Sequence, residues 1–307
     1  MVKPSSVISD LHTIRDFVRW GISRFNQADL YYGHGTTNAK DEALALITHT
    51  LFLPSDIDET FFDARLTVDE KEQLVKLFKR RVDERIPVPY LTGEAWFLGL
   101  PYKVDKRVII PRSPIAELIE NSFQPWLGEN YPQRILDMCS GSGCIGIACA
   151  HQFEGTHVDL VDLSDQALAI ANENIAMHGL EYTVSAIKSD MFATLNSEYD
   201  KYDLIVSNPP YVDSEDFHFM PVEFSHEPKM ALTAGEDGLE MAHILLSQAA
   251  DYLTDDGVLI VEVGNSGEAL EHCYPDVEFN WLEFERGGVG VFAVTAKELR
   301  QLQAKMS

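Results

Sequence analysis

Apolar positions in the first part of the chain recur three and four residues apart, the spacing of one face of a helix. One series spans residues 7–22 and a second spans residues 43–51. A third helix is expected over residues 68–84, because Thr67 is a suitable N-cap and Glu70 stands three residues later, as in a capping box. The first part of the chain is therefore predicted to be helical.

From Gln133 onward the pattern changes to short apolar runs that alternate with segments of helical periodicity. Strands are expected at residues 134–138, 157–162, 183–188, 202–207, 257–263, 277–284 and 289–295. Helices are expected between the earlier strands, at residues 144–151, 164–178 and 237–253. This alternation predicts an α/β fold with a doubly wound, mainly parallel, seven-stranded sheet. Only residues 285–288 separate the last two strands, which predicts a hairpin and an antiparallel edge strand.

A stretch rich in proline and aromatic residues separates the two patterns. Residues 85–90 break the helical periodicity, which predicts a linker, and residues 91–105 are typical of a short β-hairpin. We therefore expect a small N-terminal helical domain for substrate docking at 1–88, a linker and β-hairpin at 89–112, and the α/β domain at 113–307. The aromatic side chains of the hairpin could form core or line a site, and Phe97 is the best candidate for a wall of the site.

The balance of charge narrows the class of partner. The 307 residues include 24 lysines and arginines against 49 aspartates and glutamates, which gives a net charge of −25. Such a surface repels phosphate backbones, so no direct DNA binding is expected. It favours a small substrate or a basic protein partner.

Other features favour a cytoplasmic protein with no metal and no membrane segment. No apolar run approaches the roughly 20 residues of a membrane helix, and the chain begins with polar helix rather than with an apolar signal core. Cys139, Cys144 and Cys149 recur every five residues, which matches no standard zinc spacing. We expect these cysteines to be buried and free.

The segment Asn208-Pro209-Pro210-Tyr211 follows the apolar run 202–206 and is the first candidate for chemistry. Two consecutive prolines cannot donate to a sheet and force an extended path, so the strand ends there. Ligands of open α/β sheets bind at the carboxyl ends of strands. A fixed amide and carbonyl beside a ring can hold a flat group that carries an NH2. The alternative is that the prolines only end the strand and that Tyr211 packs in the core.

The second candidate is the stretch 134–146, which combines a strand, a glycine turn and the start of a helix. Gly141 and Gly143 let the backbone turn sharply and approach a ligand. Asp162 ends the next strand about 20 residues later, where an acid hydrogen-bonds ribose hydroxyls. With Gly146, the glycines also match the dinucleotide fingerprint, so a nicotinamide enzyme is an alternative.

Three features favour a different ligand. Asp137 at the end of the first strand suits a cationic group rather than a pyrophosphate, and Asp190 and Met191 offer an acid and an apolar surface to an adenine. The segment that begins with Asn208 has no task in hydride transfer. S-adenosylmethionine, with its adenine, ribose, sulfonium and amino-acid tail, accounts for all of them. The expected cofactor-binding residues are Asp137, Cys139, Ser140, Gly141, Ser142, Gly143, Asp162, Asp190, Met191 and Asn208.

Five segments in order carry a resemblance to a known family. They are Tyr90-Leu91-Thr92-Gly93-Glu94, Ile110-Pro111-Arg112, the stretch from Asp137 to Gly143, Asn208-Pro209-Pro210-Tyr211 and Glu227-Pro228. Together they resemble the class I methyltransferases that modify the side-chain amide nitrogen of glutamine, the HemK/PrmB group. The resemblance implies a Rossmann-like, S-adenosylmethionine-dependent protein methyltransferase.

The same segments separate two branches of that group. Release-factor methyltransferases usually continue Pro-Arg with Pro-Glu-Thr-Glu and carry Gly-Thr-Gly in the cofactor loop. Here the chain has Ser113-Pro114-Ile115-Ala116 after Arg112 and Gly141-Ser142-Gly143 in the loop. These forms are similar to the PrmB branch, which methylates ribosomal protein L-three of the large subunit, a basic partner that suits the negative charge.

The resemblance also implies roles for the proline segment. Asn208 and the carbonyl of Pro209 would accept the two amide hydrogens of the substrate glutamine, and Tyr211 would pack on the flat amide. The expected catalytic residues are thus Asn208, Pro209 and Tyr211, and the expected substrate-binding residues add Pro210 and Phe97.

Three alternatives to this function stay open at the level of the sequence. They are a release-factor glutamine methyltransferase, a methyltransferase of the exocyclic amine of adenine in DNA or RNA, and a nonenzymatic ribosome-assembly factor. An adenine edge is also a flat group with an NH2, but it must be flipped out of the duplex to be reached. His226 invites a role as general base, but a loop histidine beside a carboxylate is more often part of a surface pair.

Overall fold

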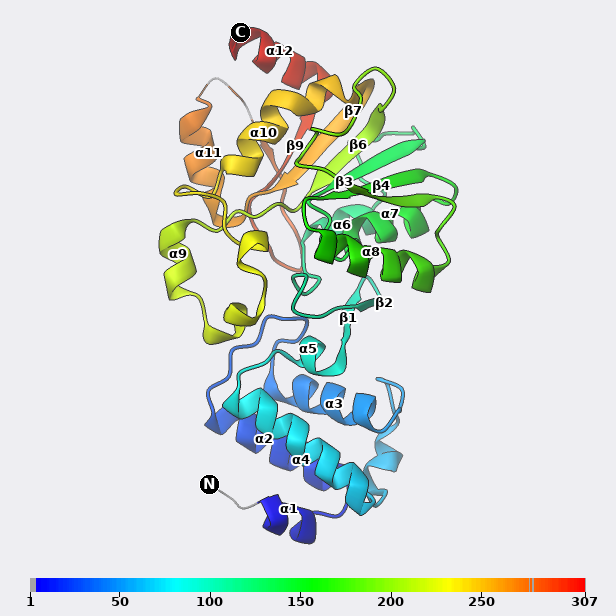
Figure 1. Cartoon of the computed structure of the whole chain (residues 1–307), viewed down its shortest axis with the longest axis vertical. Helices are drawn as coiled ribbons and strands as arrows, with labels where there is room; N and C mark the ends of the chain where they lie inside the picture. Colours follow the sequence, from blue (N-terminus) through cyan, green and yellow to red (C-terminus); the bar gives the residue numbers. More distant parts are fainter. Residues whose placement is uncertain (1–3, 276, 278, 307) are drawn as a thin grey trace. The chain divides into compact units, whose positions relative to one another are not determined.

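The computed structural model describes residues 4–275, 277 and 279–306 (Figure 1). Its contacts divide the chain into two compact units. The helical unit comprises Met1–Ala95 and Pro221–His226, and the α/β unit comprises Trp96–Met220 and Glu227–Ser307. The division differs from the expected boundaries in one respect above all: a segment from a distant loop belongs to the helical unit.

The helical unit is built from three longer α-helices, two short α-helices and two short 3₁₀ turns among its described residues. Its elements are α1 (Pro4–Asp10), α2 (Ile14–Gln27), α3 (Ala39–Thr50), η1 (Glu59–Asp63), α4 (Val68–Asp83), α5 (Val88–Thr92) and η2 (Val222–His226). The capping box of Thr67 and Glu70 at the start of α4 is confirmed. The periodicity over residues 7–22 is shared by two helices, because Thr13 and Asp16 form a second capping box that starts α2.

The expected linker at residues 85–90 is wrong in part, because α5 begins at Val88. Proline is tolerated in the first turn of a helix, where its missing N–H has no intrahelical partner. Pro89 therefore lies in the first turn of a helix where the sequence pattern suggested a break. Gly93, with φ of 78°, ends it in the left-handed conformation.

A buried ion cluster explains why the segment Pro221–His226 belongs to the helical unit. Arg81 is fully buried, and its Nε lies 2.7 Å from Glu42 Oε2. Its Nη1 lies 3.2 Å from Glu223 Oε1, which also accepts from the Tyr31 backbone N–H. A buried guanidinium needs such partners, so Glu223 draws its segment into this unit.

The α/β unit carries the large sheet. Its strands are β1 (Glu94–Phe97, where the division falls), β2 (Leu100–Lys103), β3 (Arg134–Met138), β4 (His157–Asp162), β5 (Val184–Lys188), β6 (Tyr202–Ser207), β7 (Leu253–Glu262), β8 (Asn280–Trp281) and β9 (Val291–Thr295). Its helices are α6 (Ile115–Glu120), α7 (Cys144–Gln152), α8 (Asp165–His178), α9 (Ser214–Phe219), α10 (Glu240–Gln248), α11 (Gly267–Cys273) and α12 (Ala296–Met306), with short turns η3 (Lys229–Ala231), η4 (Ala249–Asp251) and η5 (Gly264–Ser266). Strands β1 and β2 form the expected hairpin.

The seven-stranded, mainly parallel sheet is confirmed. Its strand order is β5-β4-β3-β6-β7-β9-β8, with β9 antiparallel to both β7 and β8. The final hairpin and an antiparallel edge strand were expected, and β8 is that edge. Strand β8 covers only Asn280–Trp281 of the predicted 277–284. Glu278 of that prediction lies outside the described residues. Strand β7 is longer than predicted because it starts at Leu253, before the exposed polar residues Asp255 and Asp256.

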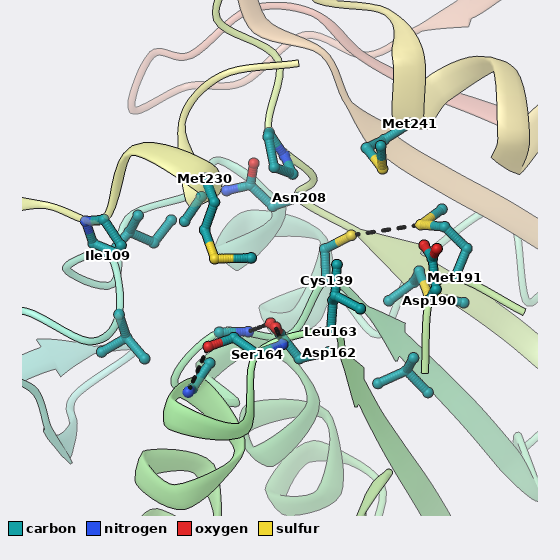
Figure 2. A pocket seen from close by; sticks show the side chains of 18 of the residues that line it. Ile109, Cys139, Asp162, Leu163, Ser164, Asp190, Met191, Asn208, Met230 and Met241 are labelled. Carbon is teal, nitrogen blue, oxygen red and sulfur yellow. Dashed lines mark hydrogen bonds between the residues drawn. The ribbon is translucent and has the colours of Figure 1, made fainter. Parts of the chain in front are cut away.

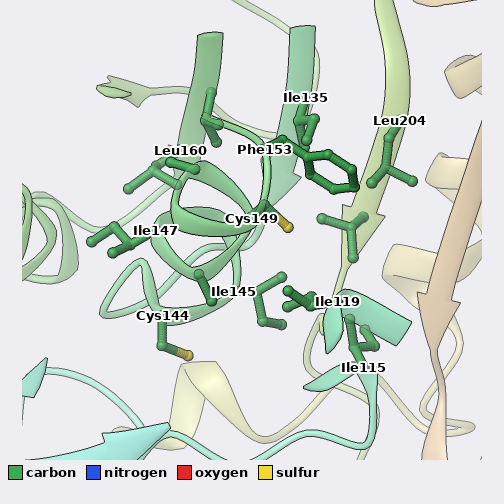
Figure 3. Close-up of a cluster of buried hydrophobic side chains, with 14 of the residues drawn as sticks. Ile115, Ile119, Ile135, Cys144, Ile145, Ile147, Cys149, Phe153, Leu160 and Leu204 are labelled. Carbon is green, nitrogen blue, oxygen red and sulfur yellow. The ribbon is translucent and has the colours of Figure 1, made fainter. Parts of the chain in front are cut away.

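Alternate residues of the central strands enter two different cores. Ile135 and Leu204 face one core, with side chains of α6, α7 and α8, and Figure 3 shows part of this cluster. Leu136 and Ile205 face the other core, with side chains of α10, α11 and α12. A sheet covered on both faces explains the continuous apolar runs of the sequence. Chemistry is therefore left to the loops at the strand ends.

The order of strands reverses direction between β3 and β6. From β3 the chain builds outward through β4 and β5, and it then returns to add β6 and β7 on the other side. Ligands of open α/β sheets bind at such a switch point, beyond the carboxyl ends of the strands. Met138 pairs with Ser207 across these strands, so the next residues, Cys139 and Asn208, leave the sheet side by side.

Candidate active site

A cavity of 480 Å³ in the α/β unit lies at the carboxyl ends of β3, β4 and β6 (Figure 2). Seven of the predicted site residues line it: Cys139, Gly141, Asp162, Asp190, Met191, Asn208 and Pro210. The other predicted site residues, Asp137, Ser140, Ser142, Gly143, Pro209, Tyr211 and Phe97, do not line it. The structure thus brings the glycine turn, the acid after β4 and the amide after β6 to one cavity.

The two glycines of the turn have different surroundings. Gly141 has φ of 55°, and a Cβ placed on it meets no atom within 4 Å. A Cβ on Gly143, with φ of 79°, would come within 2.7 Å of Leu160 Cδ1. Gly141 therefore leaves the cavity open for close approach of a ligand, whereas Gly143 lets the turn pack on the sheet.

Asp162 fixes the glycine turn from the neighbouring strand. Its Oδ2 accepts from the Gly141 backbone N–H at 2.8 Å, and its Oδ1 accepts from the Ser164 backbone N–H at 2.8 Å. Burial raises the pKa of this carboxyl group. Because the carboxylate also lines the cavity, it can accept from ligand hydroxyls without leaving its backbone partners.

Asp137 lies beneath the turn rather than on the cavity wall. It is 1% exposed, and its Oδ2 accepts from the Gly146 N–H at 2.8 Å near the start of α7. Burial raises the pKa of Asp137 to about 7. Neither its Oδ1 nor the Ser140 Oγ has a hydrogen-bond partner among the described residues. Buried polar atoms normally find partners, so this pair fits a polar, cationic ligand tail at the turn.

Sulfur-containing and apolar side chains form one wall of the cavity. Cys139 Sγ lies 3.9 Å from Met191 Sδ, and Met241 faces the same space (Figure 2). Leu163, directly after Asp162, is 51% exposed although it is a large apolar residue. Together with Asp190, this wall offers a flat apolar group both contact area and an acceptor.

Asn208 presents an oriented amide to the cavity. Its Nδ2 donates to the Arg112 carbonyl at 3.4 Å, and because a carbonyl only accepts, this contact selects the rotamer that leaves Oδ1 as the free end. The preceding Ser207 donates its Oγ to the Met138 carbonyl at 2.6 Å and fastens the end of β6 to β3. Asn208 can therefore accept a hydrogen from a substrate.

Tyr211 and Phe97 are held outside the cavity lining. The Tyr211 hydroxyl donates to Glu262 Oε1 at 2.9 Å. Phe97 is 6% exposed and belongs to the core cluster that contains Tyr102. The structure places Phe97 in the core rather than in a wall, because an apolar ring at an inward hairpin position gains most by burial.

Sequence reasoning missed the ion pair behind Asn208. Arg112 Nη1 lies 2.6 Å from Glu227 Oε1, and Nη2 donates to Oε2 at 2.7 Å. The Ile110 N–H donates to the same carboxylate at 2.9 Å. Arg112 and Glu227 both belong to segments that carry the resemblance, but no sequence pattern indicates that residues 115 apart pair.

His226 is not part of the cavity. Its Nε2 lies 2.8 Å from the Glu84 carbonyl within the helical unit. Within the part of the chain that the structure describes, no three His, Cys, Asp or Glu side chains form a group that could hold a metal. All four cysteines are free thiols. No helix among the described residues is both long and apolar enough to span a membrane.

Comparison with known proteins agrees with this geometry. A family model described as "Methyltransferase small domain" matches residues 123–274. A relative from Francisella tularensis subsp. tularensis, named ribosomal protein uL3 glutamine methyltransferase, is 49% identical and covers 97% of this chain and 94% of its own length. A relative of the same name from Xanthomonas campestris pv. campestris is 49% identical over 99% of this chain and 97% of its own length.

A solved structure supports the fold. The hMettl16 catalytic domain, in complex with MAT2A 3′UTR hairpin 6, has a TM-score of 0.50 and 16% identity, and the match covers 74% of this chain and 80% of that chain. At this identity the likeness shows the fold alone, a class I Rossmann-like methyltransferase.

The residues at the cavity fit S-adenosylmethionine, the methyl donor of this fold and family. Gly141, Asp162 and Asp190 line the cavity, and the unpartnered Asp137 and Ser140 atoms lie at the turn. With this cavity, and with nearly full-length identity to two curated relatives, the chain is an S-adenosylmethionine-dependent methyltransferase and belongs to the family of ribosomal protein uL3 glutamine methyltransferases.

Proposed function

We propose that this protein methylates the side-chain amide nitrogen of a glutamine in large-subunit ribosomal protein uL3. The observation that carries the proposal is the oriented amide of Asn208 on the wall of the cofactor cavity. Two relatives named for that reaction support the substrate. The net charge of −25 suits a basic ribosomal protein, and such a substrate goes with a cytoplasmic location.

The contribution of the chain to the reaction is mainly to position the two reactants. An amide nitrogen is a poor nucleophile, because its lone pair is delocalised into the carbonyl. S-adenosylmethionine would supply a methyl group on a good leaving group, so no strong base is needed to deprotonate the amide nitrogen before transfer. Well-oriented reactants gain at most about 7–11 kcal/mol from proximity.

Asn208 and Pro209 are the groups we propose to hold the glutamine. Asn208 Oδ1 and the Pro209 carbonyl accept the two hydrogens of the substrate NH2, which directs the lone pair of the nitrogen toward the cavity. The same two acceptors stabilise positive charge as it develops on that nitrogen. Tyr211 and Pro210 bound the flat face of the amide, and the helical unit docks the remainder of the protein substrate.

Transfer of a labelled methyl group tests the substrate directly. The purified enzyme is incubated with tritium-labelled S-adenosylmethionine and, separately, with uL3, a release factor, DNA or ribosomal RNA. We expect label in uL3, on a glutamine identified by mass spectrometry. The uL3 variant with alanine in place of that glutamine is the control, and it should carry no label. Label in the release factor or only in nucleic acid would contradict the proposal.

A further inference from the structure

Tyr211 is held at its hydroxyl, its carbonyl and its ring by residues at the end of β7 and next to it, and by Gly238. Its hydroxyl donates to Glu262 Oε1 at 2.9 Å, and its carbonyl accepts from Ser266 Oγ at 3.1 Å. Its ring lies so close to Gly264 that a Cβ there would come within 2.5 Å of a ring atom. Gly238 lies as close to the Tyr211 carbonyl, at 2.3 Å for a built Cβ. The position of this ring is therefore set by its surroundings rather than by its own rotamer preference.

Glu262 links Tyr211 to Asn208, the first residue of the segment Asn208–Tyr211. It is 5% exposed at the end of β7, and its Oε2 accepts from Ser113 Oγ at 2.6 Å. Ser113 directly follows Arg112, whose carbonyl accepts from Asn208 Nδ2. The buried carboxylate of Glu262 thus binds the hydroxyl of Tyr211. It also binds Ser113, which belongs to the segment that orients Asn208.

A carboxylate suits this position better than any neutral side chain. Both partners of Glu262, the hydroxyls of Ser113 and Tyr211, donate to it, and a carboxylate offers two acceptor oxygens and no donor. Burial raises the pKa of Glu262 to about 7, while Arg112 nearby opposes that rise. The guanidinium of Arg112 is itself bound to Glu227, so Glu262 depends chiefly on the two hydroxyls.

We propose that Glu262 is a positioning residue: it fixes the ring of Tyr211 and, through Ser113, the Arg112 carbonyl that orients the Asn208 amide. This inference rests on the proposed function, in which Asn208 and Tyr211 hold the substrate amide. Both carboxylate oxygens of Glu262 accept from hydroxyls of the chain itself, so the inferred role acts through Tyr211 and Ser113.

The variants Glu262→Gln and Tyr211→Phe test the proposal. Glutamine keeps the shape but offers one acceptor in place of two, so one hydroxyl must turn away. We expect Glu262→Gln to lower kcat ~10–100-fold, as small misplacements of reacting groups do, with the cofactor Kd unchanged. Tyr211→Phe keeps the ring and is expected to lose less, and the double variant is expected to be no worse than Glu262→Gln alone.

Tyr202→Phe is the matched control for Tyr211→Phe, at the start of β6, the strand that the segment Asn208–Tyr211 follows. Tyr202 is fully buried, and its hydroxyl donates to Asp159 Oδ2 at 2.8 Å. Loss of the Tyr202 hydroxyl also removes a hydrogen bond between a phenol and a carboxylate. We therefore expect a lower Tm but an unchanged kcat. Equal loss of kcat in Tyr202→Phe and Glu262→Gln, or wild-type kcat in Glu262→Gln, would overturn the proposal.

A crystal structure of Glu262→Gln keeps the inference separate from the identity of the substrate. We expect a displaced Tyr211 ring or Ser113 segment relative to the wild-type crystal. An unchanged site would overturn the inference whatever the substrate proves to be. Failure of the wild-type enzyme to label uL3 would overturn the proposed function alone, and kcat of the variants would then be measured on the substrate that is labelled.

Discussion

At the scale of single residues, the orientation of one amide matters most. Asn208 has a donor and an acceptor end, and only a partner of known polarity decides which end faces the cavity. The Arg112 carbonyl takes the donor end, and the bidentate pair of Arg112 with Glu227 holds that part of the chain. The acceptor end is the one that, in the proposed function, holds the substrate amide.

We expect Asn208→Ala to reduce methyl transfer ~10²–10³-fold, the range for removing one preorganised polar group from an active site. Cofactor affinity is expected to stay within a few-fold of wild type, as measured by calorimetry. Asn172→Ala, on the exposed face of α8, is the control for the same change of residue. Loss of cofactor binding in Asn208→Ala would make Asn208 a cofactor residue instead.

Asp162→Ala is expected to weaken cofactor binding. The carboxylate both lines the cavity and holds the Gly141 N–H, and hydrogen bonds to charged groups contribute ~1.5–3 kcal/mol, so Kd should rise ~10–100-fold. Asp165→Ala is a suitable control, because Asp165 lies three residues away and pairs with Lys188 at the surface. Titration calorimetry measures both, and an unchanged Kd in Asp162→Ala would contradict a role in binding the ribose.

Asp137 should make the stability of the cofactor-free protein depend on pH. Its pKa rises from 3.8 to about 7 on burial, so the folded state binds the proton more tightly than the unfolded state. The resulting stabilisation is complete below the unfolded pKa and is lost as pH rises through about 7. We expect Tm to fall less between pH 5 and pH 8 in Asp137→Asn than in wild type. Parallel Tm curves would contradict this assignment.

At the scale of elements, the turn between β3 and α7 depends on a glycine for packing. Gly143 and Gly155 both have positive φ, 79° and 85°, but only a Cβ on Gly143 would meet another side chain. A left-handed residue other than glycine costs about 1–2 kcal/mol, and overpacking costs about 1–3 kcal/mol more.

Alanine substitution at both positions separates these two costs. Gly143→Ala is expected to lower the free energy of unfolding by about 2–4 kcal/mol, and Gly155→Ala by about 1–2 kcal/mol, in urea titrations. Equal losses would mean that Leu160 moves aside and that backbone strain alone requires glycine at residue 143.

At the scale of the whole molecule, one short segment leaves the α/β unit and returns to it. The segment Pro221–His226 leaves the α/β unit after Met220, contributes Glu223 to the ion cluster of the helical unit, and returns at Glu227. Glu227 then pairs with Arg112. The two units are therefore joined by the chain on both sides of this short segment as well as through β1.

The net charge predicts a strong effect of salt on the protein substrate. Raising ionic strength from about 0.01 M to about 0.15 M shortens the Debye length from about 30 Å to about 8 Å. We expect kcat/KM for uL3 to fall severalfold over this range, because attraction of a basic protein to an acidic one is screened. The cofactor Kd serves as the control and should change little. A kcat/KM for uL3 that is independent of salt would contradict electrostatic steering.

The sequence by itself determined the strands of the parallel part of the sheet and the order of the motifs. Runs such as Leu204-Ile205-Val206 must be buried on both faces, and Pro209-Pro210 must end a strand, because local chemistry leaves no other choice. The same local signals predicted the cap at Thr67 and the glycine turn at residues 141–143. They failed at Pro89, which was expected to break the helical pattern but lies in the first turn of α5.

Only the tertiary structure decided which distant residues meet. Neither the pair of Arg112 with Glu227 nor the contact of Glu262 with Tyr211 has a sequence signal, because each joins segments that are adjacent only when the sheet is assembled. The same holds for Phe97, whose aromatic character suits a core as well as a wall. Local periodicity fixes elements, whereas the partners of buried polar groups depend on how those elements pack.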